Sequence, residues 1–63
     1  MFSWIEDLRR AKGYSQQRLA QEAGISQSYY SAIVLGVRGV KPRTAKKIAK
    51  VLGFDWTKFY EEE

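Results

Sequence analysis

The chain has 63 residues, a net charge of +4 and neither cysteine nor histidine. This length allows one domain, residues 1–63, with a small core, and the composition excludes disulfides, thiolate metal sites and histidine metal sites, so we expect no metal and no cofactor. No apolar run is long enough to cross a bilayer and no charged-then-apolar leader opens the chain, so we expect a cytoplasmic protein without membrane contact.

The first predicted helix begins at a capping-box pattern, Ser3-Trp4-Ile5-Glu6, and runs to about Lys12. In a capping box, the Ser3 hydroxyl accepts a hydrogen bond from the Glu6 amide while the Glu6 carboxylate accepts one from the Ser3 amide. The inward face is predicted to carry Trp4, Ile5, Leu8 and Ala11. Gly13 is expected to end this helix.

Residues 16–35 read as two short helices that meet at a tight turn. Two apolar stripes at helical spacing are formed by Leu19, Ala20 and Ala23, and then by Tyr30, Ile33 and Val34. Gly24 suits the left-handed end of the first helix, while Ser15 and Ser26 are expected to cap the two helices. The small Ala20 lets two crossed helices approach closely. This arrangement predicts a helix-turn-helix, whose second helix is built to enter the DNA major groove.

Two further helices are predicted after this unit. Gly36 closes the second helix of the unit and a loop follows at residues 37–41. Pro42 suits a first helical position, and the next helix is expected to run from there to Leu52 and to end at Gly53. Asp55 is a suitable N-cap for a short fifth helix. Together the elements predict an all-α fold, a compact five-helix domain.

The run at residues 16–35 resembles the helix-turn-helix of the Cro/repressor family, also called the xenobiotic-response-element family. The likeness covers nearly the whole chain, because residues 8–16 resemble the first helix of the family and residues 45–53 resemble its fourth. The resemblance implies a lambda-repressor-like fold and a double-stranded DNA partner. The segment at residues 54–62 is also similar to short repressors of phages and mobile elements of Gram-positive bacteria.

The charge distribution agrees with a nucleic-acid partner. Ten basic residues and one acid, Glu22, lie between Arg9 and Lys50, whereas the other acids lie near the two ends. A basic middle section predicts a positive face that attracts a polyanion with salt-dependent affinity.

Four residues of the second helix of the unit are expected to contact bases, namely Gln27, Ser28, Ser31 and Ala32. A glutamine amide can pair with adenine N6 and N7, and the methyl group of an alanine can meet that of thymine. In lambda-type repressors this helix also begins Gln-Ser, with an alanine four residues after the serine, as in Gln27-Ser28 and Ala32. The alternative is that these glutamine and serine residues are ordinary polar residues on a solvated helix surface.

Contacts to the DNA backbone are expected from Gln16, Gln17, Tyr29, Arg38, Lys41 and Arg43. In the lambda-type group, the first glutamine of the preceding helix contacts a phosphate and steadies the first glutamine of the recognition helix. These roles map onto Gln16 and Gln27. Backbone contacts of this kind position a protein on DNA without specifying sequence. A solvated surface is the expected role of Lys50.

The chain departs from the family pattern at Val34, where many members carry a glutamate that pairs with an arginine of the first helix. The arginine concerned is Arg9 or Arg10, and we expect it to pair instead with Glu6, Asp7 or DNA. An apolar replacement of a buried ion pair is often tolerated, so the fold is not in question. Tyr30 is expected in the core with its hydroxyl at the rim.

The last aromatic residues suggest an association surface. Phe54 and Phe59 are expected to close the core, whereas Trp56 and Tyr60 form a possible dimer patch. Members of the family commonly pair through this end, which implies a homodimer on DNA and a near-palindromic site.

The sequence therefore predicts a sequence-specific transcriptional regulator, a repressor that acts by operator occupancy. The alternative is a protein-interaction module, an antitoxin or adaptor, and a regulatory protein partner is compatible with both. An enzyme is not expected, because there is no histidine, cysteine or paired inward carboxylate and little room for a pocket.

Overall fold

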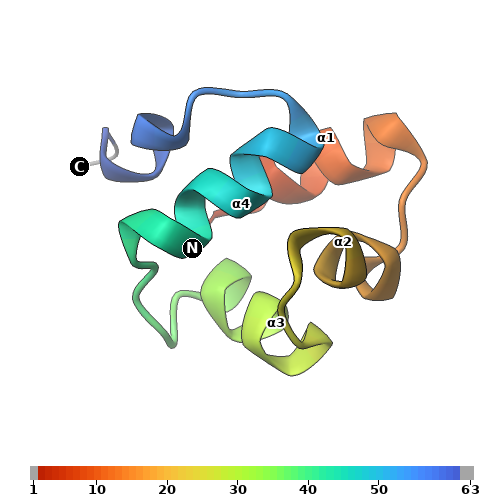
Figure 1. Ribbon diagram of the computed structural model, residues 1–63, viewed down its shortest axis with the longest axis horizontal. Helices are drawn as coiled ribbons and strands as arrows, with labels where there is room; N and C mark the ends of the chain where they lie inside the picture. The colour runs from red at the N-terminus through yellow and green to blue at the C-terminus, as the bar shows by residue number, and fades with distance from the viewer. Residues whose placement is uncertain (1, 62–63) are drawn as a thin grey trace.

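The computed structural model describes residues 2–61, which are entirely helical and irregular and contain no strand (Figure 1). The elements are α1 (Ser3–Lys12), α2 (Gln16–Ala23), α3 (Gln27–Leu35), α4 (Pro42–Leu52) and a 3₁₀ helix, η1 (Trp56–Tyr60). The all-α class is confirmed, but the expected fifth α-helix is wrong. The helix that begins after the Asp55 cap is only five residues long, and a run this short is typical of 3₁₀ geometry.

The predicted boundaries of α2 and α3 are confirmed because local side chains satisfy their ends. The Oγ atoms of Ser15 and Ser26 each accept a hydrogen bond from a backbone amide of the first turn, at 3.0 Å. Gly24 adopts the left-handed conformation, with φ at 73°, and its amide closes the end of α2. A side chain there would strain the backbone, so glycine is required for this turn.

The capping box predicted for α1 is wrong. The N-cap residue is Phe2, Ser3 is already helical, and no side chain caps this end. The Glu6 carboxylate lies instead against side chains of α1, α2 and α3. The predicted inward face is also too wide, because Ile5 is buried but Ala11 is exposed.

Helix α4 lies across the molecule and packs against α2 on one side and η1 on the other, while α2 packs against α3 (Figure 1). The buried apolar core draws on every element and consists of Ile5, Leu19, Ala20, Ala23, Tyr30, Ile33, Val34, Ala45, Ile48 and Phe59. Both predicted stripes of the helix-turn-helix are in this list. The core therefore sets the angle between α2 and α3 and leaves the opposite face of α3 outside.

The two ends of the described chain meet in an aromatic cluster. Phe59 is 4% exposed, and its ring centroid lies 5.3 Å from that of Phe2, 5.5 Å from that of Trp4 and 5.6 Å from that of Phe54. Phe59 is buried and Phe54 half-buried, in agreement with their predicted role. None of the helices in residues 2–61 combines the length and apolar character needed to cross a membrane.

Candidate nucleic-acid interface

The two N-caps place polar side chains at the beginning of each helix of the unit. Ser15 precedes Gln16 and Gln17 in the first turn of α2, and Ser26 precedes Gln27 and Ser28 in the first turn of α3. Because the stripe of α3 at Tyr30, Ile33 and Val34 faces the core, residues on the other side of the helix face outward. The local capping chemistry thus determines which polar groups are presented together.

An open groove of about 450 Å³ runs along the outer face of α3. Its lining residues are Gln16, Gln27, Ser28, Ser31, Ala32, Leu35 and Val37. The structure therefore brings all four residues expected to contact bases into one groove, together with the first glutamine of α2. Gln27 and Ser28 are exposed, whereas Ser31 and Ala32 are half-buried.

A second hollow of about 410 Å³ adjoins the groove and shares Ser28 and Ala32 with it; its other lining residues are Ser26, Tyr29 and Arg38. The guanidinium carbon of Arg38 lies 5.6 Å from the centroid of the Tyr29 ring. A cation above an aromatic face is attracted to it, so the Tyr29 ring holds a basic group of the loop beside α3. The two residues expected to contact the DNA backbone here lie side by side.

The remaining residues expected to contact the backbone lie outside both grooves. Lys41 occupies the N-cap position of α4 and Arg43 its first turn, and both are exposed. Gln17 is exposed at the start of α2. The structure thus gathers Gln16 and Arg38 against α3 and leaves the other three at nearby helix starts.

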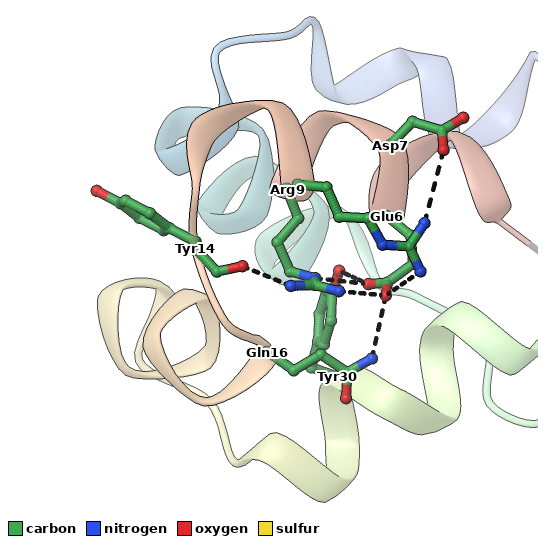
Figure 2. Close-up of polar contacts among 7 residues, drawn as sticks. Glu6, Asp7, Arg9, Tyr14, Gln16 and Tyr30 are labelled. Atoms are coloured by element: carbon green, nitrogen blue, oxygen red, sulfur yellow. Dashed lines mark hydrogen bonds and ion pairs between the residues drawn. The ribbon is translucent and has the colours of Figure 1, made fainter.

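A buried carboxylate of α1 contacts one of the residues that line the groove, Gln16 (Figure 2). Glu6 is 8% exposed, and Arg9 donates to both its oxygens, from Nε to Oε2 at 3.0 Å and from Nη2 to Oε1 at 2.8 Å. The Tyr30 hydroxyl donates to Oε2 at 2.6 Å, and the Gln16 side-chain amide donates to Oε1 at 3.2 Å. One carboxylate of α1 is therefore tied to both helices of the unit.

These contacts determine the ionisation of the cluster. The hydrogen bonds from Arg9 are the main reason why the pKa of Glu6 is lowered from 4.5 to about 2, against the opposing effect of burial. The carboxylate beside Arg9 in turn raises the pKa of that arginine. Burial, followed by the hydrogen bond to Glu6, raises the pKa of the Tyr30 hydroxyl. At neutral pH the cluster is an ion pair that accepts a hydrogen bond from a neutral phenol.

The position predicted for the Tyr30 hydroxyl is therefore wrong. The side chain is in the core as expected, but it is fully buried and its hydroxyl ends on Glu6 instead of reaching the rim. Of the partners expected for Arg9 or Arg10, which were Glu6, Asp7 or DNA, the structure shows Glu6 paired with Arg9. Arg9 also donates from Nη1 to the Tyr14 carbonyl oxygen, which closes the turn between α1 and α2.

The two residues of the predicted dimer patch differ in their surroundings. Tyr60 is 46% exposed and its hydroxyl donates to the Val40 carbonyl oxygen at 2.7 Å, which ties η1 to the loop after α3. Trp56 is half-buried, with the Lys46 Nζ atom 5.0 Å from its ring centroid. Of this pair, Tyr60 offers the larger free surface.

The sequence did not indicate two apolar residues of the groove. Leu35 is 57% exposed and Val37 is 77% exposed, and both line the end of the groove beyond Ala32. Leu35 lies outside the buried stripe of α3, and this position in the helical spacing could have indicated that its side chain is exposed. Nor did the sequence indicate that Glu6 contacts Gln16 and Tyr30, because their positions lie 10 and 24 residues apart from it.

Comparisons with known proteins agree with this geometry. The model of the Helix-turn-helix family matches residues 5–59. The uncharacterized HTH-type transcriptional regulator YqaF of Bacillus subtilis is 40% identical over 62 residues, which cover 98% of this chain and 82% of that protein. The solved N-terminal DNA binding domain of SinR from Bacillus subtilis superimposes with a TM-score of 0.85 at 29% identity, over 97% of this chain and 90% of that domain.

The match spans α1 to η1, and the helix pair with its groove is the part of the fold that this family uses on DNA. The chain therefore belongs to the helix-turn-helix family of the Cro/C1 type, a family of DNA-binding transcription regulators and not of enzymes.

Proposed function

We propose that this chain is a sequence-specific repressor of transcription that acts by occupying a double-stranded DNA operator. The observation that carries the proposal is the groove on α3, in which four residues suited to base contacts lie together. Residues 1–63 act as one DNA-binding domain, with the helix-turn-helix at residues 16–35. Because its target is DNA, we place its action in the cytoplasm.

Base reading is assigned to the outer face of α3. Gln27, exposed in the first turn, pairs with the N6 and N7 positions of adenine through both ends of its amide. Ser28 and Ser31 donate to or accept from either type of base, and the Ala32 methyl group meets a thymine methyl group. These contacts supply the sequence preference.

Backbone contacts are assigned to the surrounding polar and basic residues, which are Gln16, Gln17, Tyr29, Arg38, Lys41 and Arg43. Support comes from the Arg38 guanidinium held above the Tyr29 ring and from the exposure of Lys41 and Arg43 at the start of α4. Neutralised phosphates release counterions, so affinity falls as salt rises.

Two copies are proposed to bind one operator, with Tyr60 and Trp56 in the surface between them. The longest dimension of the Cα framework is 27 Å, whereas successive major grooves on one face of DNA are about 34 Å apart. One copy carries a single α3 and reaches one of these grooves. A second copy related by a two-fold axis reaches the next.

The relatives support the assignment to transcription. YqaF carries the name of a transcriptional regulator, and the SinR domain is a DNA binding domain. A role limited to binding a protein partner, as in an antitoxin or adaptor, is the alternative function, and the same experiment tests it.

The deciding experiment is the selection of bound duplexes from a random DNA pool at near-physiological salt. We expect enrichment of a two-fold symmetric motif, whose half-site corresponds to one α3. Enrichment of an asymmetric half-site would support the regulator and contradict the dimer. No enrichment, with binding that disappears as salt rises, would contradict the repressor and favour the protein-interaction module.

A further inference from the structure

From the interior of the fold, the Glu6 carboxylate contacts one residue of the groove on α3 that we propose binds DNA. It is the acceptor shared by Arg9 of α1, Gln16 of α2 and Tyr30 of α3 (Figure 2). Arg9 and Tyr30 belong to the interior, but Gln16 also lines the groove with Gln27. Gln16 thus connects the buried acid with the groove on the outer face.

The chemistry of this contact determines which way the Gln16 amide is turned. An ionised carboxylate only accepts hydrogen bonds, so it requires the NH₂ group of the amide and not its carbonyl oxygen. The carbonyl oxygen of Gln16 consequently points away from Glu6 (Figure 2). Without the carboxylate, the half-buried amide would be free to turn its NH₂ group either way.

We infer that Glu6 is a positioning residue for DNA recognition, which acts by orienting the Gln16 amide beside Gln27. The inference rests on the proposed function and adds a residue that does not touch DNA. The orientation leaves the Gln16 carbonyl oxygen and one N–H free of Glu6, so these two groups are available to partners in the groove that Gln16 lines with Gln27.

Arg9 and Tyr30 hold the carboxylate in place for this task. The arginine contacts both oxygens and the phenol a single one, whereas Gln16 makes one longer bond to Oε1. Arg9 and Tyr30 therefore fix the position of the carboxylate, and the Gln16 amide takes its orientation from that fixed acceptor.

The test measures how much the substitution Gln16→Ala weakens binding to the selected duplex in three backgrounds. In the wild-type chain we expect roughly a five- to tenfold loss, as for a useful hydrogen-bonding group. In Tyr30→Phe, which keeps the Glu6–Gln16 bond, the loss is expected to be similar. In Glu6→Met with Arg9→Met, which removes the acceptor without leaving an unpaired charge, the loss is expected to fall below about twofold.

Gln17→Ala is the matched control, since Gln17 is the same residue type at the next position and makes no hydrogen bond to Glu6 among the described residues. Its cost is expected to be equal in all backgrounds. If Gln16→Ala also cost the same in all three, or nothing in the wild type, Glu6 would be purely structural. A wild-type chain that selected no duplex at all would instead contradict the proposed function.

A measurement on the free wild-type protein applies even if the Met variants do not fold. The side-chain amide protons of Gln16 are expected to exchange with solvent more slowly than those of Gln17 in nuclear magnetic resonance spectra. Equal exchange rates would show that the Glu6–Gln16 bond does not hold the amide in solution, and would overturn the inference.

Discussion

At the scale of single residues, the acid that pairs with Arg9 lies on α1, the same helix as the arginine, and not on α3. Val34 occupies the α3 position and is buried, while Glu6 reaches Arg9 from one turn earlier in α1. The ion pair therefore lies within α1, and the α3 position at Val34 packs as an apolar residue in the core. Because the acid lies on α1, its carboxylate also accepts a hydrogen bond from the Gln16 side chain.

Separate roles for base reading and phosphate contact predict different effects of two alanine substitutions. Gln27→Ala is expected to cost about 1–3 kcal/mol on the preferred duplex and to relax the preference at one base pair. Arg43→Ala is expected to weaken binding to all duplexes alike and to lower the salt slope by about 1. Lys50→Ala removes the same charge from another exposed position of α4 and is the control. If Gln27→Ala and Arg43→Ala had the same effects in titrations of preferred and scrambled duplexes, the assignment of base reading and phosphate contact would be contradicted.

The ionisation of Glu6 predicts a loss of stability in acid. Its pKa is about 2 in the folded chain and 4.5 in the absence of partners, so the ionised form stabilises the fold fully above pH 4.5. As the pH falls from 4.5 towards 2, this contribution disappears. One pKa unit corresponds to about 1.4 kcal/mol, so the loss is on the order of 3 kcal/mol.

Urea denaturation between pH 2 and pH 6 measures this loss. Glu6→Met with Arg9→Met is expected to flatten the dependence of the free energy of unfolding on pH. What remains is the contribution of acids such as Asp55, whose pKa is lowered because its carboxylate accepts hydrogen bonds from Thr57. An unchanged slope in this variant would mean that Glu6 is not the group that titrates.

At the scale of helices, the caps make distinct predictions for three serines. Ser15→Ala and Ser26→Ala each remove a side-chain acceptor from a backbone amide and are expected to lower the free energy of unfolding by about 1 kcal/mol. Ser3→Ala removes no cap, because Ser3 is already helical, and is expected to change it by less than about 0.5 kcal/mol. Equal costs at Ser3 and Ser26 in chemical denaturation would restore the capping box.

The same contrast shows what the sequence could and could not predict. The ends of α2 and α3 follow from residues within one turn, such as Ser26 and Gly24, so local chemistry was sufficient. The role of Glu6 depends on partners that come from α2 and α3. A capping-box pattern is present at Ser3, but the Glu6 carboxylate accepts hydrogen bonds from Gln16 and Tyr30 and does not cap α1. Patterns of helical spacing therefore predicted which residues of α3 face away from the core, and only the packed fold revealed the groove that they line and the contact between Glu6 and Gln16.

At the scale of the whole molecule, a core this small depends on its last residues. The described chain has a radius of gyration of 10.3 Å, and the ring of Phe59 closes the end of the core where the first and last segments meet. Single domains of this size have a free energy of unfolding near the lower end of about 5–15 kcal/mol. One buried aromatic ring is therefore a large share of the total.

Phe59→Ala is accordingly expected to lower the free energy of unfolding by about 3–5 kcal/mol and to leave much of the chain unfolded at 37 °C. Tyr60→Phe, at the next position, keeps its ring and loses only the hydrogen bond to the Val40 carbonyl oxygen, with an expected cost of about 1 kcal/mol. Thermal unfolding followed by circular dichroism compares the two. If Phe59→Ala melted with the Tyr60→Phe midpoint, the aromatic cluster would unfold separately from the helix-turn-helix. A single lower midpoint would instead show that η1 and the DNA-reading helices form one cooperative unit, because Phe59 packs on the same core that orients α3.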